Sequence, residues 1–351
     1  MSHHHHRRKS RLRRFQHWMK KNQKMLLCCA ALCVGTAAAV TGFVMCSLNE
    51  QKGRQVTAGK ASDTGAGYRY LTSNGKTYQY NNRITTILYA GLDSQDPLEQ
   101  TAAYGDKARA DSIMLLILDE RSKEMSVLAI SRDTMTDVHR YTRTGKDMGT
   151  YNTHLGYAYT YGDGGKASCE NLERAVSDLI GGLPITYYLV SNQTSIPMIN
   201  SLVGGVTVTV PNNDLADLHP EFTEGNVVTL DGSNVRDFVQ HRDIGETFSN
   251  SGRMERQKTF VQAFISQFRQ TVTDDPNGVW DSLESMNEWM QTDITKSKYL
   301  SLTDTINQVS FADDSYYILE GTDSQGELHD EFSYNEDALQ ELILRLFYRE
   351  V

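Results

Sequence analysis

Cysteine and proline are scarce in this sequence, and beyond residue 46 acidic residues outnumber basic ones. Of 351 residues, five are cysteine and six are proline, while 39% are hydrophobic. This balance excludes a collagen-like chain, a low-complexity disordered chain and a small disulfide-rich domain. Four of the cysteines lie at or before position 46, which leaves Cys169 without a second cysteine for a disulfide in the rest of the chain. We therefore expect an ordinary packed core, with Cys169 as a buried structural residue.

The net charge of −9 conceals two parts of opposite sign. Residues 1–24 contain five arginines, four lysines and no acidic residue, so they carry +9 and the rest of the chain carries −18. Proteins that bind nucleic acid need a basic face, because contacts to phosphates dominate their affinity. The acidic body therefore argues against a nucleic-acid partner.

One long hydrophobic run directly follows the basic segment. Residues 25–46 contain no charged residue, and as a helix they would extend about 33 Å, close to the thickness of a bilayer core. Positive charge before such a segment keeps that side in the cytoplasm. We expect a single transmembrane anchor, a cytoplasmic N-terminus and an exported body at the cell membrane. The alternative is a signal peptide cleaved near Ala37-Ala38-Ala39.

We predict four parts: a basic arm (1–24), the anchor (25–46), a polar linker or edge segment (47–83) and one exported domain (84–351). The linker is rich in Gly, Ser, Thr and Asn, and alternation at 68–80 suggests a short edge hairpin. Short apolar runs predict buried strands at Ile84–Leu92, Ser112–Leu118, Ser126–Ile130, Ile185–Val190 and Val206–Val210. Amphipathic patterns predict helices at Ser168–Ile180, Gln193–Leu202, Asp231–Gln240 (with Asp231 as N-cap), Gly252–Val272 and Asn335–Phe347. The expected fold class is α/β, with a central mixed sheet flanked by helices.

Charged residues gather where the predicted strands begin or end. Asp93 follows one strand, Arg109 and Asp111 precede the next, and Arg132 and Asp133 follow a third. Ligands of open α/β sheets bind at strand ends. Two carboxylates such as Asp93 and Asp111 suit Mg²⁺, and arginines match phosphate oxygens. The alternative is that each Arg-Asp pair forms a local salt bridge or turn cap.

A second arginine group lies further along the chain. Arg242 follows one predicted helix, and Arg253, Arg256 and Gln257 share one face at the start of another. Backbone N–H groups at a helix start already attract anions, so an anionic ligand such as phosphate would also relieve the unfavourable placement of cations there. The alternative is a solvated face with Glu255 as partner.

These motifs, in this order and spacing, resemble the LytR-CpsA-Psr family. The resemblance rests on ILYAGLDS, RADSIMLLILDERSKEMSVLAISRDT, YNTHLGYAYTYG, GGVTVTVP, VRDFVQHRD and GRMERQ, and it covers about Thr85 to Val272. It implies a membrane-anchored enzyme of mostly Gram-positive bacteria. Such an enzyme transfers a glycopolymer, such as teichoic acid or capsular polysaccharide, from a polyprenyl-pyrophosphate carrier to peptidoglycan. The implied product is a phosphodiester at the C6 hydroxyl of N-acetylmuramic acid.

The resemblance also implies roles for individual residues. Asp93 and Asp111 match acids associated with Mg²⁺, and Asp133 matches an acid that either orients Arg132 or takes part in proton transfer. The arginines around the pyrophosphate correspond to Arg109, Arg132, Arg242, Arg253 and Arg256, and Gln257 matches the amide of that motif. We therefore assign catalysis to Asp93, Arg132 and Asp133, and we expect exposed residues such as Tyr151, Asn152 and Tyr157 to contact glycan.

The sequence departs from the family pattern at two places. Ser249, Asn250 and Ser251 stand where an acid commonly precedes the Gly-Arg pair, and Thr150-Tyr151-Asn152 replaces Lys-Ile-Asn. Two other functions compete with transfer: a module that binds prenyl-linked glycans without chemistry, and a hydrolase that uses water in place of the sugar hydroxyl. A regulator acting on DNA is excluded, because 24 cytoplasmic residues cannot form a DNA-binding domain.

Overall fold

A computed structural model describes residues 69–351, except residues 74, 243–248 and 327–328. The predicted basic arm, the predicted anchor and most of the predicted linker lie outside the described residues. No helix within the described ranges is both long and apolar enough to cross a bilayer. The predictions for residues 1–68 therefore stay predictions.

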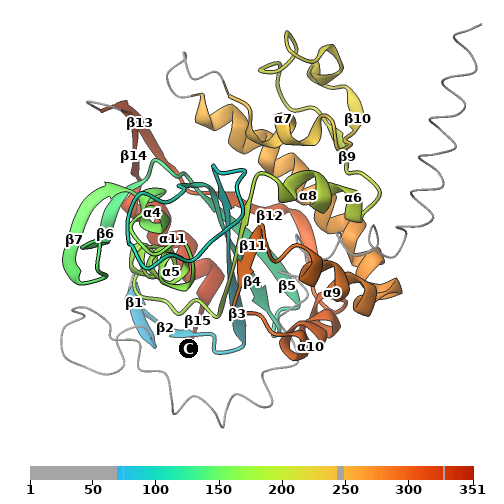
Figure 1. The fold of residues 1–351 in the computed structure, drawn as a ribbon. Coiled ribbons are helices and arrows are strands. Elements are labelled where there is room, and N and C mark those ends of the chain that lie inside the picture. Colours follow the sequence, from blue (N-terminus) through green and yellow to red (C-terminus); the bar gives the residue numbers. More distant parts are fainter. Residues whose placement is uncertain (1–68, 74, 243–248, 327–328) are drawn as a thin grey trace, which may run out of the picture.

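A six-stranded mixed sheet forms the centre of the molecule (Figure 1). Its strands, in spatial order, are β11 (Met290–Thr292), β8 (Tyr187–Asn192), β3 (Ile84–Leu92), β4 (Ala110–Asp119), β5 (Glu124–Ile130) and β12 (Ser310–Ile318). Strand β3 runs parallel to β8 and antiparallel to β4, and β5 runs antiparallel to β4 and parallel to β12. The predicted α/β class and the central mixed sheet are confirmed.

Helices cover both faces of this sheet. On β4, Met114 and Leu116 pack into one core while Ile113, Leu115 and Ile117 pack into another, because successive strand residues point to opposite faces. The first core lies under α6 (Ser195–Leu202), α7 (Val235–Gln240), α8 (Asn250–Asp274), α9 (Pro276–Ser285) and α10 (Lys296–Ile306). The second lies under α4 (Tyr157–Thr160), α5 (Lys166–Leu179) and α11 (Glu336–Phe347). Burial on both faces explains the near-continuous apolar runs of β3 and β4.

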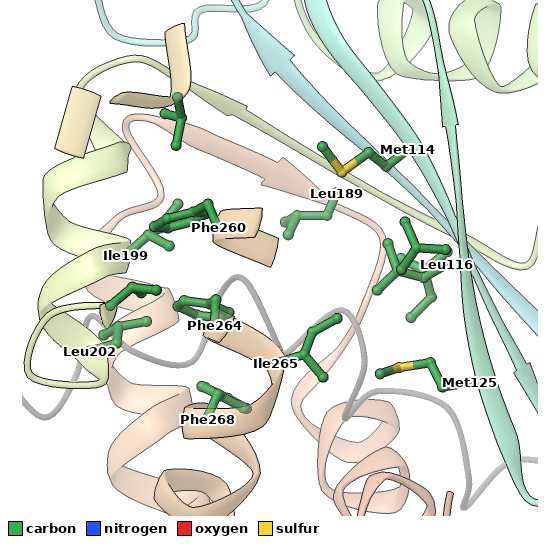
Figure 2. Packing of buried hydrophobic residues seen from close by; sticks show 14 of the residues in the cluster. Met114, Leu116, Met125, Leu189, Ile199, Leu202, Phe260, Phe264, Ile265 and Phe268 are labelled. Carbon is green, nitrogen blue, oxygen red and sulfur yellow. The ribbon is translucent and has the colours of Figure 1, made fainter. Parts of the chain in front are cut away.

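Helix α8 supplies much of the first core (Figure 2). Phe260, Phe264 and Phe268 are one turn apart, and their rings stack with centroids 5.8 and 5.7 Å apart. They face Met114 and Leu116 on the sheet (Figure 2). Burying a side chain of this size contributes roughly 1.5–3 kcal/mol, so this stripe fixes α8, and the arginines at its start, against the sheet.

Small antiparallel sheets lie around the central one. The predicted edge hairpin is confirmed as β1 (Tyr70–Ser73) and β2 (Lys76–Tyr80), and β2 also pairs with β15 (Tyr348–Glu350). Two further hairpins are β6 (Met135–Tyr141) with β7 (Asp147–His154), and β13 (Gly321–Gln325) with β14 (Asp330–Tyr334). Strand β9 (Thr207–Thr209) pairs with β10 (Val227–Thr229). A short 3₁₀ helix, η1, spans Pro220–Phe222.

The structure corrects two sequence predictions. Val206–Val210 was expected in the central sheet, but β9 pairs only with β10. Gly205 turns the chain there with φ +101°, and a Cβ on it would lie 2.7 Å from the carbonyl oxygen of Leu230. Asp231 does not cap a helix: its carboxylate accepts from the N–H and hydroxyl of Ser233, and α7 begins four residues later with Asn234 as its N-cap residue.

The prediction for Cys169 is confirmed. This residue is fully buried in α5, and its thiol donates to Oε1 of Gln291 at 3.4 Å. Burial raises the pKa of the thiol, so Cys169 is held in its unreactive protonated form.

Candidate active site

Three strand ends converge at one edge of the central sheet. Strand β3 ends at Leu92, just before Asp93, and Leu92 pairs with Ala110, the first residue of β4. Strand β5 also runs antiparallel to β4, so it ends at the same edge. The β3–β4 register shifts between Gly91, paired with Ser112, and Leu92, paired with Ala110. Asp111 is therefore the extra residue of a β-bulge, a feature that re-aims side chains and is common beside active sites.

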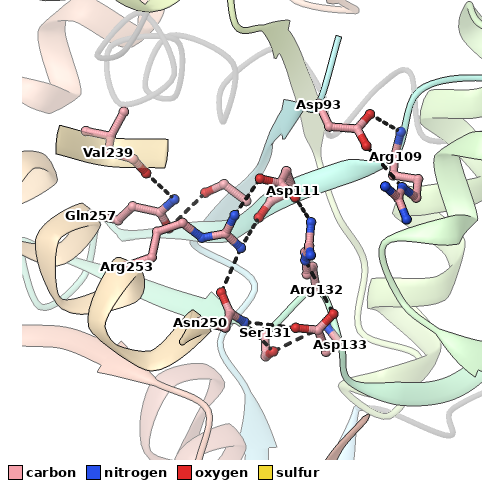
Figure 3. A network of polar contacts seen from close by, with 11 residues as sticks. Asp93, Arg109, Asp111, Ser131, Arg132, Asp133, Val239, Asn250, Arg253 and Gln257 are labelled. Atoms are coloured by element: carbon pink, nitrogen blue, oxygen red, sulfur yellow. Dashed lines mark hydrogen bonds and ion pairs between the residues drawn. The ribbon is translucent and has the colours of Figure 1, made fainter. Parts of the chain in front are cut away.

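Asp111 is the centre of a charged network (Figure 3). One carboxylate oxygen accepts from Nη1 of Arg132, and the other accepts from Nη1 of Arg253 at 2.5 Å. Nη2 of Arg253 also donates to the Asp111 backbone carbonyl at 3.1 Å. The side chain of Arg253 is 3% exposed and that of Arg132 is 16% exposed. Arg253, from α8, thus lies on the buried side of Asp111, and Arg132, which follows β5, lies on its more exposed side.

Asn250 connects the two arginines from below (Figure 3). Its Oδ1 accepts from Nη2 of Arg253 at 2.7 Å, and its Nδ2 donates to Asp133 at 3.2 Å and to Ser131 at 3.0 Å. The other oxygen of Asp133 lies 3.3 Å from Nε of Arg132. Each arginine therefore has a fixed orientation before any ligand binds.

A second pair lies at the same edge. Both carboxylate oxygens of Asp93 accept from Arg109, one from its backbone N–H at 2.8 Å and one from Nε at 3.0 Å. Burial would lower the pKa of Arg109, but hydrogen bonds to Asp93 and Tyr157 raise it above its usual value. The local ion pairs considered in the sequence analysis do exist here, and they lie next to one another rather than scattered over the surface.

The positive charges act on one another. Burial, together with Arg253, Arg242 and Arg109 nearby, lowers the pKa of Arg132 to about 10. Burial, with Arg242 again contributing, lowers that of Arg253 to about 10. Both arginines stay charged at neutral pH, and in the described part of the chain Nε of Arg253 has no hydrogen-bond acceptor. Four mutually repelling arginines form a site that an anion stabilises.

Arg256 does not join this network. Its side chain is 1% exposed and donates to Asp214 at 2.7 Å, to the carbonyl of Phe238 at 2.9 Å and to the carbonyl of His241. These bonds hold the chain segment that leads directly into Arg242. The family resemblance implies a place for Arg256 around the pyrophosphate, whereas its contacts here are those of a residue that positions a neighbour.

Gln257 lies between the charged network and an apolar pocket. Its Nε2 donates to the carbonyl of Val239 at 2.9 Å, and its Oε1 accepts from Ser112 at 3.3 Å. The pocket begins beside Asp111 and runs between the sheet and the helices, and its cavity volume is about 80 Å³. Its apolar lining includes Tyr89, Met114, Leu116, Ile196, Ile199, Phe260, Phe264 and Ile265. The Asp111 carboxylate thus contacts the arginines and also lines the apolar pocket.

No group of three or more His, Cys, Asp or Glu side chains with metal-binding geometry occurs among the described residues. Asp93 and Asp111 are the acids at this edge that the sequence assigned to a hard cation, and a carboxylate has about four lone-pair sites, of which the arginines use only some. Mg²⁺ commonly takes one or two carboxylates and completes its shell with water and substrate phosphates. The donor set fits such an ion only together with a phosphate ligand.

Comparison with known proteins identifies the chain's relatives. The model of the LytR_cpsA_psr family matches residues 49–346. The chain belongs to this family. Within the LytR-CpsA-Psr family, two curated relatives are named polyisoprenyl-teichoic acid–peptidoglycan teichoic acid transferase TagU. The one from Bacillus mycoides is 32% identical over 46% of this chain and 48% of its own length, and the one from Bacillus cereus is 29% identical over 52% of each. The chain thus spans about half the length of the curated relatives it matches.

Solved structures of other proteins share the fold. TagT of Bacillus subtilis has a TM-score of 0.54 at 19% identity, with 76% of this chain and 90% of that chain covered. A structure of TagT bound to LIIa-WTA has a TM-score of 0.56 at 20% identity, with the same coverage. The described residues therefore share the fold of these structures.

The charged residues at the strand ends lie at one edge, as predicted, and two further residues of the site carried no prediction. Asn250 had been noted only as a departure from the family's usual acid, yet it bridges Arg253 and Asp133. Asp214, the partner of Arg256, carries no motif of its own. Its only signal is the neighbouring Gly252, at which a Cβ would lie 2.0 Å from the Asp214 carboxylate.

Proposed function

We propose that this protein transfers a glycopolymer from a polyprenyl-pyrophosphate carrier to peptidoglycan. The transferred polymer is a teichoic acid or capsule-like polysaccharide, and the new bond is a phosphodiester at the C6 hydroxyl of N-acetylmuramic acid. The observation that carries the proposal is the junction at Asp111, where an apolar pocket opens beside the clustered arginines. A lipid with a long apolar chain and a pyrophosphate head matches this junction, because its chain fits the apolar pocket and its pyrophosphate fits the arginines.

The lipid part of the donor would enter the apolar pocket. Phe260, Phe264 and Ile199 line it together with strand residues, and Gln257 stands at its charged end. Burial of a prenyl chain stabilises the complex by roughly 25 cal/mol per Å² of apolar surface removed from water. Binding energy from this unreactive part of the substrate holds the phosphates at the arginines.

The pyrophosphate would lie against Arg109, Arg132 and Arg242, the arginines nearest the open side. Charge develops on the phosphate oxygens and on the leaving polyprenyl phosphate during transfer, and fixed guanidinium groups stabilise it. Arg253 holds the Asp111 carboxylate in place by an ion pair. Asp133 holds Arg132 in the same way, and Asn250 orients Asp133 by a hydrogen bond. Of the two roles considered for Asp133, these contacts favour orienting Arg132 over proton transfer.

We further propose that Asp93 and Asp111 hold Mg²⁺ when the donor is bound. The ion would supply positive charge that neutralises phosphate oxygens. Asp93 is the more exposed of the two acids, at 26% of its side chain against 13% for Asp111. Asp93 is thus the acid that a ligand reaches first.

The anchor, the exported location and the peptidoglycan partner belong to the same proposal. An uncharged segment of 22 residues behind nine positive charges would keep the enzyme at the outer side of the cell membrane, where both substrates are found. A lipid-linked donor stays in that membrane, so an anchored enzyme meets it by diffusion in two dimensions.

The full chain, purified in detergent, tests the proposal. It is incubated with a synthetic polyprenyl-pyrophosphate oligosaccharide and peptidoglycan oligomers, in Mg²⁺ or in EDTA, and the products are identified by mass spectrometry. A metal-dependent adduct on muramic acid supports the transferase. Carrier release without an adduct points to the hydrolase, and binding without any turnover points to the non-catalytic module.

A further inference from the structure

A row of tyrosines and arginines leads away from the site on the side opposite the apolar pocket. Arg109 lies with Cζ 5.8 Å from the ring centroid of Tyr157, and the Tyr157 ring stacks on Tyr161 at 6.1 Å and 16°. Arg140 follows, with Cζ 5.2 Å from the Tyr161 ring and 4.9 Å from the Tyr151 ring. We call these five residues the tyrosine–arginine row.

The row combines α4, which covers the second core, with the two strands of the β6–β7 hairpin. Tyr157 and Tyr161 are the first residue and the C-cap of α4, one turn apart, so their rings stack. Arg140 lies in β6 where the β6–β7 register shifts between His139 and Tyr141, and this irregularity re-aims its side chain. Figure 1 shows α4 and the β6–β7 hairpin on one side of the sheet and α6 and α8 on the other.

The outer end of the row projects into solvent. The first six of the eight residues of β7 are exposed, and Tyr151 is 61% and Met148 67% exposed. Tyr151 thus presents its ring to solvent beside the guanidinium of Arg140. Tyrosine faces pack against the apolar C–H face of a sugar ring, and guanidinium groups donate hydrogen bonds to its hydroxyl and acetamido oxygens.

We propose that the tyrosine–arginine row binds the acceptor, a strand of N-acetylated amino sugars. This inference rests on the proposed function and adds the acceptor surface to it. In phosphoryl transfer the attacking and leaving oxygens lie roughly in line. The leaving polyprenyl phosphate would depart toward the apolar pocket beside Asp111 and Gln257, so the acceptor hydroxyl arrives from the Arg109 side, where the row begins (Figure 3).

The exposure of Arg140 and Tyr151 at the outer end of the row also favours the acceptor over the donor glycan, while Tyr157 and Tyr161 are half-buried. Peptidoglycan is a large network that cannot enter a cavity, so it requires a protruding surface. The β6–β7 hairpin is such a surface, and it is joined to the reacting centre through the continuous contacts of Tyr157 and Arg109. Stacked rings one turn apart present a line that a linear sugar strand can follow.

The test compares three substitutions in the full chain: Tyr151→Ala, Arg140→Gln and Tyr161→Ala. Each should raise the acceptor KM by about 3- to 10-fold, the size of one aromatic or cation–π contact, while the donor KM stays within twofold. Tyr161→Phe keeps the ring and should keep the affinity. Tyr70→Ala removes a tyrosine of similar exposure, 55%, on strand β1, which belongs to a different sheet, and serves as the matched control.

Sedimentation with insoluble peptidoglycan measures binding without turnover. The unmodified chain and Tyr70→Ala should sediment with it, and Tyr151→Ala and Arg140→Gln should stay largely in the supernatant. If the unmodified chain transfers nothing but sediments in a row-dependent way, the acceptor surface stands and the transferase proposal fails. Unchanged acceptor KM and sedimentation in all three variants, or a rise in donor KM alone, would overturn the inference.

Discussion

Removal of Arg132 should abolish transfer while the fold is kept. In Arg132→Ala, Asp111 keeps its ion pair with Arg253, and Asp133 keeps the hydrogen bond from the Asn250 amide, so both acids retain a hydrogen-bond donor. An arginine that stabilises charge on a transferred phosphoryl group contributes on the order of 10³-fold or more in rate, about 4 kcal/mol. We therefore expect kcat/KM for transfer to fall by about 10³-fold.

Removal of Arg253 should have a different effect. Its guanidinium donates to the Asp111 carboxylate, to the Asp111 carbonyl and to Asn250, and its side chain is 3% exposed. Breaking a buried pair by removing one partner costs about 3–5 kcal/mol. For a domain of this size that lowers the melting temperature by about 6 °C or more. Arg253→Ala should thus lose both stability and activity.

The two variants are measured side by side with Arg132→Lys as a control. Thermal unfolding followed by circular dichroism reports stability, and initial rates with the synthetic donor report transfer. Arg132→Lys keeps the charge but not the planar fork, so it should recover only part of the activity. Transfer by Arg132→Ala within tenfold of the unmodified enzyme, or an unchanged melting temperature for Arg253→Ala, would refute the reasoning.

Three further predictions concern the pocket, the helix start and the metal. Ile199→Trp partly fills the apolar pocket and should raise the KM of a long-chain donor about tenfold, but not that of a short-chain analogue; equal effects on both donors in steady-state kinetics contradict the lipid assignment. Gly252→Ala puts a Cβ where the Asp214 carboxylate lies 2.0 Å away, so it should displace Asp214 from Arg256 and lower the unfolding free energy by roughly 1–3 kcal/mol in a urea titration; an unchanged midpoint contradicts this. EDTA should stop transfer and added Mg²⁺ restore it, and Asp93→Asn should need several-fold more Mg²⁺ for half-maximal rate; transfer that persists in EDTA contradicts the metal proposal.

Strands buried on both faces were predictable because they carry continuous apolar runs. Strand β3 agrees with the prediction residue for residue, and β4 and β5 differ only by short extensions. Strand β12 was missed because Asp313 and Asp314 interrupt its apolar pattern, at the place where its register with β5 shifts. The exposed hairpin β6–β7 was missed because β7 has no buried face to impose alternation.

The candidate site was predictable only where its residues lie beside strong strands. Asp93, Arg109, Asp111 and Arg132 flank apolar runs, so the topology brings them to one edge. The hydrogen bond from Asn250 to Asp133 and the ion pair of Arg256 with Asp214 depend on how the start of α8 packs against segments far away in the sequence. Such contacts join residues far apart in the chain, and sequence periodicity carries no signal for them.

The central claim is that a sugar hydroxyl, and not water, attacks the glycan-side phosphorus. Transfer run in ¹⁸O-labelled water tests it most directly, with the phosphorus-containing products analysed by mass spectrometry. The account predicts an unlabelled phosphodiester on muramic acid and unlabelled polyprenyl phosphate, because no oxygen from water enters either product. Labelled glycan phosphate or labelled polyprenyl phosphate as the main product would contradict it and identify the enzyme as a hydrolase.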